Sequence, residues 1–555
     1  MAIELTPVSG VYNLSNYQET KETFEWDQAK EALYYGETGK MNAAYETIDR
    51  HVADGYGDKI ALHYVDQEES YSLTFQQVKE KTDHYARILK ENDVKKGDRV
   101  FIFLPKNVAC YISILSVIKI GAIAGPLFEG FMDEAIQDRI NDCQGTLLIT
   151  DRTLGKRVKK NLIPSLKEIL YTEDIESKTY GTESDASLIE WVDPEDGLLI
   201  HYTSGSTGKP KGVLHAHRSI IHHYQTGKWV LDIQEDDVYW CTSHPGWVTG
   251  SVYGLFAPWL NKATIVIQGG RFKAENWYQL IETLQVTTWY SAPTAFRMLM
   301  AQGDLNKNYD LTSLRHVLSV GEPLNPEVIS WAWYTLNLRI HDTWWMTETG
   351  GHLIVNLPSE TIKAGSMGRA FPGIYVGILD DEGKELPNGE VGQLAVKTPW
   401  PGLMKEIWGN NDKYNSYFQY EGWYISGDLA FQDSEGYVFF QGRNDDMINS
   451  AGERIGPFEV ESTLIEHPAV AEAGVIGKPD ALRGEIVKAF ITLRTGYNAS
   501  TELTEEIRLF VRNKLAAHSA PREIEVIDEL PKTKISGKIL RRELKQQEIE
   551  KSFVK

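Results

Sequence analysis

The stretch Tyr202-Thr-Ser-Gly-Ser-Thr-Gly-Lys-Pro-Lys-Gly212 is the most informative part of this chain of 555 residues. It directly follows residues 198–200, an apolar run that is typical of a buried strand. Its glycines, hydroxyl side chains and lysines offer backbone N–H groups, O–H donors and positive charge to phosphate oxygens. Because α/β proteins bind ligands at the carboxyl ends of their strands, this position favours a phosphate loop over a flexible surface loop.

The spacing of the loop excludes the P-loop of nucleotide kinases. That motif needs four residues between its glycines and then Gly-Lys-Ser/Thr. Here two residues separate Gly205 from Gly208, and Pro210 follows Lys209. Proline removes the N–H where the kinase-type helix would begin, so the loop belongs to another class of phosphate site.

The chain around the loop alternates short apolar runs with longer segments of helical period, from about residue 60 to 345. One helix is predicted to open at Thr74, which forms a capping-box signature with Gln77. Apolar strands separated by helices indicate mostly parallel sheets covered by helices on both faces, so we predict an α/β fold class. The predicted strands include residues 100–104, 147–149, 198–200, 263–267 and 316–320.

The pattern changes after about residue 365, where short strands predict a smaller antiparallel unit. We expect this β-barrel-like subdomain at about 365–442, inside a large N-terminal domain of residues 1–444. A turn-rich stretch then precedes helix-period segments and a short strand pattern near Val475. They predict a smaller, mobile α+β C-terminal domain over residues 445–555. The predicted strands of the subdomain are residues 375–379, 391–397 and 437–440.

The charge balance is 57 Lys and Arg against 78 Asp and Glu, a formal net charge of −21. Such a chain is repelled by nucleic acid and anionic lipid, which excludes both as partners. Cys110, Cys143 and Cys241 are too few and too scattered for a disulfide framework, so we expect a reducing compartment. The N-terminus has no secretion signal, and the apolar residues 108–125 hold Lys119, which favours a buried helix over a membrane span. We therefore predict a cytoplasmic protein.

The loop at 203–212 resembles the signature loop of the adenylate-forming superfamily, which comprises acyl-coenzyme A synthetases, peptide-synthetase adenylation domains and luciferases. The resemblance covers nearly the whole chain, from Tyr45 to Arg542. Within the superfamily, the doubled tryptophan Trp344-Trp345 and the segment Gly246-Trp-Val-Thr-Gly250 resemble AMP-forming acetyl-coenzyme A synthetases. Three further segments occur in the order typical of the superfamily: His341-Asp-Thr-Trp-Trp-Met-Thr-Glu-Thr-Gly350, Tyr424-Ile-Ser-Gly-Asp428 with Gly442-Arg443, and Pro531-Lys-Thr-Lys-Ile-Ser-Gly-Lys538.

The resemblance implies a reaction in two steps. A carboxylate attacks the α-phosphorus of ATP to give acyl-AMP and pyrophosphate, and the thiol of coenzyme A then takes the acyl group and releases AMP. Both steps concentrate negative charge, so positive groups and Mg²⁺ are needed. The implied ATP or AMP contacts are Thr203, Ser204, Gly205, Ser206, Thr207, Gly208, Lys209, Lys211, Gly321, Glu322, Pro323, Asp342, Thr343, Trp344, Trp345, Met346, Thr347, Asp428, Arg443 and Arg454.

The resemblance also implies individual roles. Glu348 would ligate Mg²⁺, which prefers carboxylate oxygen. Thr347 and Arg454 would contact phosphate, and Asp428 with Arg443 would hold the ribose, although taken singly that pair reads equally well as turn residues. Lys538 would bridge the attacking carboxylate and the α-phosphate. One residue more than usual separates Pro531 from Lys538, so Lys534 stays an alternative.

The acyl pocket is implied at Val248, Thr249, Val320 and Trp345. A tryptophan at position 345 closes the pocket floor and favours acetate, while propionate would be a poorer substrate, because one methylene changes the free energy by only about 1 to 3 kcal/mol. Met346 stands where family members usually carry glutamine.

Other acids, and loading of a carrier-protein thiol, are the alternative functions. Propionate or another short acid would keep the reaction and change the substrate. A stand-alone adenylation enzyme would load a carrier protein in place of free coenzyme A, and the chain ends about 17 residues after Lys538 with no carrier domain following. We also expect that a protein acetyltransferase and deacetylase act on Lys538, because the lysine is exposed between the two steps.

Several further positions are implied more loosely. Coenzyme A contacts are expected from Thr249, Ala451, Gly452 and Arg512, and from Lys156 and Arg157 in a basic cluster at 152–160 that is equally typical of a solvated helix face. Asp445 matches a hinge about which the C-terminal domain swings. The family can bind a cation through a loop that here holds Ile465, His467 and Val470. For the histidine group, packing or solvation is favoured over a metal, because no Cys or carboxylate lies at ligand spacing; the group is His215, His217, His222 and His223.

Overall fold

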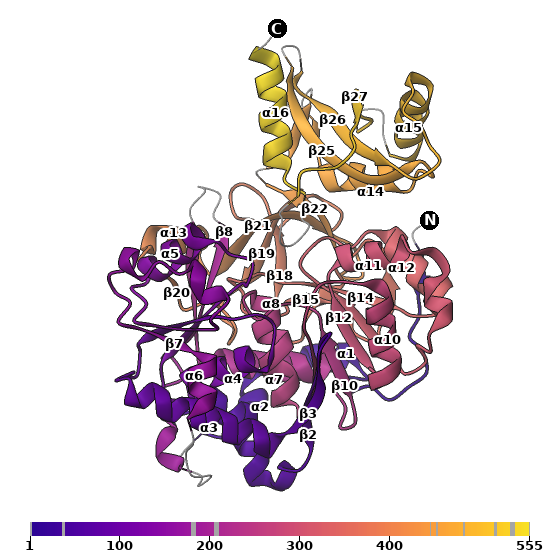
Figure 1. The fold of residues 1–555 in the computed structure, drawn as a ribbon. Helices are drawn as coiled ribbons and strands as arrows, with labels where there is room; N and C mark the ends of the chain where they lie inside the picture. The colour runs from indigo at the N-terminus through magenta and orange to yellow at the C-terminus, as the bar shows by residue number, and fades with distance from the viewer. Residues whose placement is uncertain are drawn as a thin grey trace.

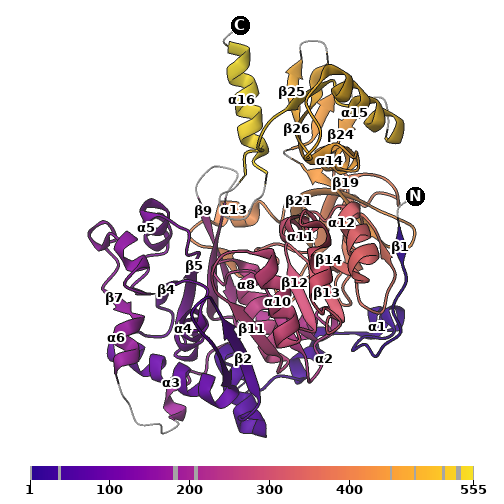
Figure 2. The same ribbon diagram turned by 45° about the vertical axis from the view of Figure 1, so that its right-hand side comes forward.

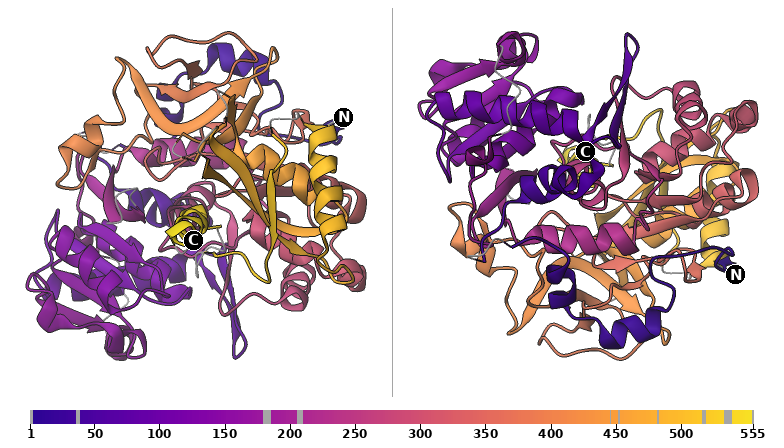
Figure 3. Two further views of the ribbon diagram at one scale, coloured as in Figure 1. Left: turned by 90° about the horizontal axis from the view of Figure 1, so that it is seen from above. Right: turned by 90° about the horizontal axis from the view of Figure 1, so that it is seen from below.

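The computed structural model describes residues 3–35, 39–178, 185–204, 210–444, 446–450, 453–480, 483–515, 519–532 and 539–553. Two large sheets with their helices form a broad body, and the C-terminal elements stand above it (Figures 1 and 2). Seen from above, helix α16 (Arg541–Phe553) is viewed almost end-on beside the C-terminal strands, and from below indigo and purple helices cover the body (Figure 3). None of the helices in the described ranges combines the length and apolar character needed to cross a membrane.

The first large sheet has nine strands, and its central strands are parallel. It confirms the predicted strands at 263–267 and 316–320. Its order is β17 (Arg369–Ala370), β15 (Ile354–Val355), β14 (Ile340–Trp344), β13 (His316–Ser319), β12 (Thr288–Ser291), β10 (Val238–Cys241), β11 (Thr264–Gln268), β2 (Ile60–Val65) and β3 (Ser70–Thr74).

The second large sheet has seven strands and is parallel from β8 to β7. Strands β8 and β9 pair antiparallel on either side of the predicted phosphate loop. The chain therefore continues as a strand after the loop, which confirms that the loop does not open a kinase-type helix. The order is β20 (Glu406–Ile407), β9 (Pro210–Ala216), β8 (Gly197–Ser204), β5 (Ile123–Leu127), β4 (Arg99–Phe103), β6 (Leu147–Thr150) and β7 (Glu168–Tyr171).

The predicted antiparallel unit is a four-stranded sheet, and each of its strand pairs is antiparallel. Its strands are β18 (Val376–Leu379), β19 (Gly392–Lys397), β21 (Trp423–Gln432) and β22 (Val438–Arg443). Strand β21, the longest, was not among the strands predicted from the sequence.

The C-terminal part is an α+β unit with its own buried cluster. Its sheet runs β24 (Glu453–Ile455), β23 (Ile448–Ser450), β26 (Gly484–Leu493) and β25 (Val470–Asp480), and β27 (Glu523–Val526) pairs with β26. Elsewhere, β1 (Glu4–Leu5) pairs with β16 (Ile362–Lys363). Contacts to the large body include Asn325 Nδ2 donating to Ser462 Oγ at 3.1 Å. The exact domain boundary stays a prediction.

The helices lie between and around the sheets (Figure 1). They are α1 (Tyr17–Thr23), α2 (Trp26–Glu31), α3 (Phe75–Glu91), α4 (Val108–Lys119), α5 (Asp133–Asp142), α6 (Thr172–Ser177), α7 (Ser219–Trp229), α8 (Val248–Ser251), α9 (Ala257–Leu260), α10 (Ala274–Leu284), α11 (Pro293–Met300), α12 (Pro326–Trp331), α13 (Asn411–Asn415), α14 (Pro457–Ile465), α15 (Thr501–Lys514) and α16. Short 3₁₀ or π turns are Tyr45–Asp49, Val52–Tyr56, Leu154–Arg157, Lys160–Leu162, Ala186–Leu188, Val252–Phe256, Gly303–Asn308 and Ala332–Leu336.

Two sequence predictions about helices are confirmed in detail. Helix α3 begins after Thr74, whose hydroxyl accepts from Gln77 N while the Gln77 side chain accepts from Thr74 N. The apolar stretch predicted to be a buried helix is α4, which packs on α3, β4 and β5. Its Lys119 is buried and paired with Asp49 at 2.9 Å and Asp83 at 2.6 Å, so the charge that argued against a membrane span is neutralised inside the protein.

Candidate active site

Predicted site residues gather at the carboxyl ends of the parallel strands of the nine-stranded sheet. Asp342, Thr343 and Trp344 are the last three residues of β14. The parallel register that pairs Ser319 with Asp342 brings the end of β13 beside them. This is the edge at which α/β sheets bind ligands. Gly321, Glu322 and Pro323 follow β13, Trp345, Met346, Thr347 and Glu348 follow β14, and Val248 and Thr249 begin α8 after β10.

A lysine on one sheet meets, at this edge, a glutamate from the turn after a strand of the other sheet. Lys211, on β9 of the seven-stranded sheet, places its Nζ 2.5 Å from Oε1 of Glu348. Tyr417 contacts both groups: its hydroxyl donates to Glu348 Oε1 at 3.1 Å and bonds to Lys211. The ammonium also lies 4.9 Å from the centroid of the Tyr417 ring. The phosphate-loop lysine and the predicted Mg²⁺ ligand are therefore direct neighbours.

The charge state of this pair follows from its surroundings. Burial on its own would raise the pKa of Glu348, but the Lys211 charge and the hydrogen bonds from Lys211 and Tyr417 outweigh it and hold that pKa below its ordinary value. The carboxylate is thus ionised. Lys413, half-buried and 4.7 Å from the centroid of the same ring, adds a second ammonium. Burial and the like charge of Lys211 lower the pKa of Lys413, so an anion bound between the two ammonium groups would stabilise their charged forms.

A second chain of contacts joins the nine-stranded sheet to the four-stranded one. Trp344 Nε1 donates to Oδ2 of Asp428 at 2.8 Å, and Arg443 Nη1 donates to Oδ1 of the same carboxylate at 2.8 Å. Asp428 and Arg443 are register partners on β21 and β22. Gly427 has φ +79°, and a Cβ there would lie 3.3 Å from the Arg443 guanidinium, so glycine permits both the turn of the backbone and the close approach. The predicted ribose pair therefore contacts Trp344, one of the predicted ATP or AMP contacts.

Other predicted ATP or AMP contacts lie in the turn after β13 and on β14. Thr294 and Arg297 bind the carboxylate of Glu322, each at 2.8 Å. Gly321 has φ +90°, a conformation that favours glycine at this turn. Asp342 is buried, and burial holds the pKa of its carboxyl well above the ordinary value. Its Oδ1 has no hydrogen-bond partner among the described residues.

Three of the four predicted acyl-pocket residues belong to one core cluster or pack against it. Val320 belongs to the cluster, and Val248 and Trp345 pack against it. The Trp345 indole lies nearly perpendicular to the ring of Tyr253, at 80° and 5.0 Å between centroids. Thr249 is half-buried beside Val248 at the start of α8. Trp345 thus contributes an aromatic surface to this cluster, and Val248 and Val320 contribute aliphatic ones.

The basic cluster at 152–160 forms two short 3₁₀ turns and not the face of a regular helix. Lys156 is exposed, whereas Arg157 donates to the Glu129 carbonyl at 2.7 Å. Arg152 and Lys159 pair with Asp174 and Asp133, respectively. Arg512 is exposed on α15. No described contact joins these residues to Lys211 or Glu348.

The histidine group is a packing feature, as the sequence favoured. His215, His222 and His223 are buried, and each bonds through Nε2 at 2.8 Å to a backbone carbonyl, those of Thr347, His352 and Gly350. His217 is buried as well and accepts from Ala43 N at 3.2 Å. The prediction that the group is solvated is wrong, because all four rings are buried. Among the described residues no three His, Cys, Asp or Glu side chains form a metal cluster.

The predicted cation loop is occupied by an arginine side chain. Arg494 Nε donates to the Val470 carbonyl at 2.9 Å, and its Nη2 reaches the Ile465 carbonyl at 3.5 Å. The same Nη2 bonds to Glu327 Oε1 of α12 at 2.8 Å. His467 is buried, with Nε2 3.5 Å from Glu506 Oε1. A guanidinium thus supplies positive charge to these carbonyls and links the loop to the large body.

Some predicted site residues lie outside the described part of the chain. Their roles stay predictions. They are Gly205, Ser206, Thr207, Gly208, Lys209, Asp445, Ala451, Gly452 and Lys538, the alternative Lys534, and the side chains of Ser204 and Arg454.

The structure adds residues that sequence reasoning missed. Tyr417 and Lys413 flank the Lys211–Glu348 pair, and Tyr424, stacked on Tyr417 at 5.5 Å, donates to the sulfur of Met346 at 3.6 Å. Met346 thereby keeps a polar contact although it has no amide. Tyr417 follows α13 in a stretch without motif, so no local pattern could have marked it.

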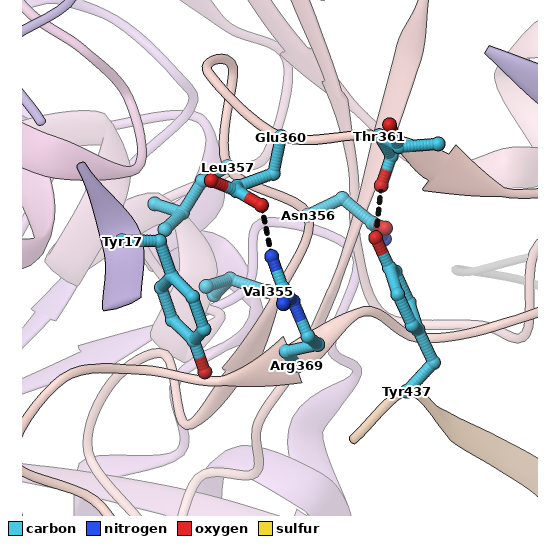
Figure 4. A pocket seen from close by; sticks show the side chains of 8 residues that line it. All are labelled: Tyr17, Val355, Asn356, Leu357, Glu360, Thr361, Arg369 and Tyr437. Carbon is cyan, nitrogen blue, oxygen red and sulfur yellow. Dashed lines mark hydrogen bonds and ion pairs between the residues drawn. The ribbon is translucent and has the colours of Figure 1, made fainter. Parts of the chain in front are cut away.

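A small cavity elsewhere in the body is shown in Figure 4. The Arg369 guanidinium pairs with Glu360 there, and the Tyr437 hydroxyl donates to the Thr361 carbonyl at 2.7 Å. Its free volume is about 10 Å³, the room of one water molecule, so it cannot hold a nucleotide. The lining residues are Tyr17, Val355, Asn356, Leu357, Glu360, Thr361, Arg369 and Tyr437.

Comparison with known protein families gives two matches that follow each other along the chain. A model described as AMP-binding enzyme matches residues 49–408, and a model described as AMP-binding enzyme C-terminal domain matches residues 459–538. The first match alone covers more than half of the chain.

Individual relatives span nearly the full length. The chain is 55% identical over 559 residues to an acetyl-coenzyme A synthetase of Bacillus subtilis (strain 168), covering 98% of this chain and 97% of the relative. It is 39% identical to an acetyl-coenzyme A synthetase of Rubrobacter xylanophilus, covering 95% and 87%. Among solved structures, an anthranilate CoA ligase in complex with anthranoyl-AMP has a TM-score of 0.85 at 30% identity, covering 94% of this chain and 99% of the other. A Brucella canis acyl-CoA synthetase has a TM-score of 0.75 at 32% identity, covering 97% and 100%.

Proposed function

This chain belongs to the family of AMP-binding enzymes, and from that premise we propose that it is an AMP-forming ligase of acetate and coenzyme A. In the first step, an acetate oxygen bonds to the α-phosphorus of ATP while the bond to pyrophosphate breaks. In the second step, the sulfur of coenzyme A bonds to the carbonyl carbon of acetyl-AMP, its thiol proton is lost, and AMP leaves. The products are acetyl-coenzyme A, AMP and pyrophosphate.

The observation that carries the proposal is the Lys211–Glu348 pair at the carboxyl edge of the sheet. Attack by an anion on a triphosphate needs fixed positive charge and a hard cation close together. The ammonium of Lys211 supplies the fixed positive charge. The ionised carboxylate of Glu348, 2.5 Å away, supplies a ligand for the hard cation. Tyr417 holds both groups, so little reorganisation is needed when phosphate arrives.

Mg²⁺ fits these residues as a partner of nucleotide phosphates. At such sites the ion is held by one or two carboxylates together with phosphate oxygens, so a single ionised carboxylate is sufficient. Glu348 would be that ligand, and the ion would neutralise charge on the leaving pyrophosphate. Lys211 would then be available to a phosphate oxygen.

The remaining site roles are proposed on the same basis. Asp428 and Arg443 bind the ribose hydroxyls, with Trp344 fixing the Asp428 carboxylate, and the turn 321–323 and β14 form the adenine shelf. Thr203 to Lys209, Thr347 and Arg454 bind phosphates. Coenzyme A is proposed to contact Thr249, Ala451, Gly452 and Arg512, with Lys156 and Arg157 near its phosphates. Lys538 contacts the attacking carboxylate and the α-phosphate.

Acetate is proposed because Trp345 walls the pocket and because the relatives at 55% and 39% identity are acetyl-coenzyme A synthetases. Each methylene that the wall excludes changes the free energy of the transition state by about 1 to 3 kcal/mol. Propionate should therefore react more slowly and butyrate more slowly again.

The C-terminal domain, residues 445–555, is proposed to swing about Asp445 between the two steps, since Lys538 and the coenzyme A face cannot serve one centre at once. Asp445→Pro, which fixes φ, should impair one step and largely spare the other. Equal losses in pyrophosphate exchange and in thioester formation would refute the hinge.

We also propose that the protein is cytoplasmic and that protein acetyltransferases and deacetylases act on Lys538. Acetylation removes the ammonium charge, so it should stop adenylation. Protein acetylated at Lys538 that adenylates acetate at the normal rate would contradict the proposal that acetylation controls the enzyme.

The function is tested with purified protein, ATP and Mg²⁺. Acetate, propionate and butyrate are compared for AMP release, with and without coenzyme A. Release that needs coenzyme A and favours acetate supports the proposal. A preference for propionate would contradict acetate as the substrate. AMP release that occurs only with a carrier protein would contradict coenzyme A as the acyl acceptor and would indicate carrier loading.

A further inference from the structure

A buried group of polar aromatic side chains supports Trp345. Tyr253, Tyr290 and His352 each have 0% exposure, whereas Trp345 is half-buried at the proposed acyl pocket. We propose that Tyr290 is a positioning residue: its hydroxyl fixes the Trp345 indole and thereby sets how long an acyl group the pocket accepts. The inference rests on the proposed function, because it concerns the acid that the enzyme selects.

Three other side chains bond to the hydroxyl of Tyr290. Tyr290, on β12, receives the Trp345 Nε1–H at 3.3 Å. The same hydroxyl lies 2.8 Å from His352 Nε2 and 2.7 Å from the hydroxyl of Thr343 on β14. One phenolic group therefore serves three partners.

Counting protons assigns each of these bonds. The Thr343 hydroxyl donates to the Ser319 carbonyl at 2.8 Å, so its oxygen is left to accept the proton of Tyr290. The Tyr290 oxygen then accepts from His352 Nε2–H and Trp345 Nε1–H, which uses both lone pairs. This requires a neutral His352 with its proton on Nε2, and its Nδ1 indeed has no partner among the described residues. Burial holds the pKa of His352 well below the ordinary value, which agrees with a neutral ring.

Ring packing completes the support. His352 is stacked on Tyr253 with centroids 3.7 Å apart and planes 9° apart, and its backbone N–H donates to the Tyr253 hydroxyl at 2.7 Å. Trp345 meets the two stacked rings edge to face, at 80° to Tyr253 and 85° to His352. Packing limits the tilt of the indole, and the bond from Nε1 to Tyr290 fixes its rotation. The indole wall therefore has one position.

Tyr290→Phe keeps the ring and removes the acceptor. Two buried N–H groups, those of Trp345 and His352, lose their partner, and the indole is then stable only if it turns toward another acceptor. Turning moves the pocket wall, and one methylene in an acyl pocket is worth about 10- to 200-fold in kcat/KM. Selectivity between acids should change more than binding of ATP.

The test is a double-mutant cycle of Tyr290→Phe and Trp345→Phe. We measure kcat/KM for acetate, propionate and butyrate, and form the ratio between the acid that the wild type uses best and the acid one methylene longer. Tyr290→Phe should lower that ratio about fivefold, the weight of one hydrogen bond, and this change should exceed the change in the KM for ATP. In the Trp345→Phe background the same change should alter the ratio by less than about twofold, because the bond it breaks is already gone.

Tyr239→Phe is the matched control. Tyr239 lies on the neighbouring strand β10, is equally buried, and its hydroxyl has no hydrogen-bond partner among the described residues. It should leave the ratio as in the wild type. An unchanged ratio in Tyr290→Phe, or an equal effect with and without Trp345, would overturn the proposal.

A second measurement does not depend on the substrate. The indole ¹⁵N–¹H resonance of Trp345, assigned by its loss in Trp345→Phe, should shift in Tyr290→Phe and stay in place in Tyr239→Phe. An unmoved resonance in Tyr290→Phe overturns the proposal even if that variant is inactive. A wild type that prefers propionate would contradict acetate as substrate while leaving the ratio of propionate to butyrate as a valid test of Tyr290.

Discussion

At the level of single residues, the central feature is an ionised carboxylate kept buried by a lysine. Glu348 is 4% exposed, and an isolated charge there would be strongly disfavoured. Lys211 and Tyr417 compensate for the lost hydration with two charge-assisted contacts. The pair is therefore preassembled for a ligand that can exchange partners with it.

Glu348→Gln should reduce acetate-dependent exchange of pyrophosphate into ATP by about a hundredfold or more, as expected when a charged group at the reacting phosphates is removed. The amide keeps the volume but cannot bind Mg²⁺ as an anion. Glu46→Gln is the matched control, because Glu46 is also buried and paired with an arginine, Arg50 at 2.8 Å, outside the site. Exchange that survives in Glu348→Gln as well as in Glu46→Gln would show that the carboxylate has no role at the phosphates.

Sequence alone could predict residues that belong to motifs but not those that join motifs. Lys211, Glu348, Asp428 and Arg443 stand in segments of recognisable order, and the structure brings them into two contact chains. Tyr417 reaches Glu348 across 69 positions, and no periodicity or spacing marks such a contact.

At the level of secondary structure, apolar runs predicted the parallel strands because both faces of a buried strand must be apolar. The antiparallel partner β9 and the long strand β21 were harder to foresee, since their residues mix polar site groups with core groups. Contacts between secondary-structure elements also link the C-terminal unit to the large body. Arg494, the residue after β26, pairs with Glu327 of α12, next to the Asn325–Ser462 bond.

Arg494→Met should loosen that link by a small amount. The ion pair is partly exposed, with side chains 39% and 23% accessible, so it is worth only about 0.2–1 kcal/mol. The undocked population should therefore rise about 1.4- to fivefold. The native cysteines are buried, so fluorescent labels can be placed at Tyr334→Cys and Leu509→Cys, both exposed positions, and energy transfer between them should fall.

Arg508→Met is the control for this measurement. Arg508 is also a partly exposed arginine in the C-terminal unit, but its partner Glu505 lies on the same helix, three residues away. Equal transfer efficiencies in Arg494→Met and Arg508→Met would mean that the Arg494–Glu327 pair does not hold the two parts together.

At the level of the whole molecule, the buried histidines make stability depend on pH. Burial lowers their pKa below the ordinary 6.5, to about 3 for His217 and about 4 for His51. Below pH 6.5 the histidines of the unfolded chain bind protons, whereas those of the folded protein stay neutral until the pH reaches their lowered pKa values. The histidines' contribution to stability is therefore fully present above pH 6.5 and is lost as the pH falls toward the pKa values of the folded protein. The set is His51, His201, His215, His217, His222, His223, His244, His316, His341 and His352.

We expect the midpoint of thermal unfolding to fall steadily between pH 7 and pH 5. Each histidine of the set contributes up to about 1.4 kcal/mol per pH unit below its unfolded value. Carboxyls whose pKa burial raises act in the opposite direction but are fewer than the histidines of the set; they are Glu46, with a pKa of about 7, and Asp49, Glu129, Asp142, Asp232 and Asp342. A midpoint that is constant or rises from pH 7 to pH 5, followed by differential scanning calorimetry, would contradict this reading of the core.

We propose that an acetate oxygen attacks the α-phosphorus of ATP at the edge where Lys211 and Glu348 meet. Acetate labelled with ¹⁸O in both carboxylate oxygens tests it most directly, in a reaction with ATP, Mg²⁺ and coenzyme A, followed by mass spectrometry of the nucleotide and phosphate products. We expect AMP that carries one ¹⁸O, unlabelled pyrophosphate, and acetyl-coenzyme A that keeps the other ¹⁸O. Label in inorganic phosphate with ADP as the nucleotide product, or unlabelled AMP, would contradict it.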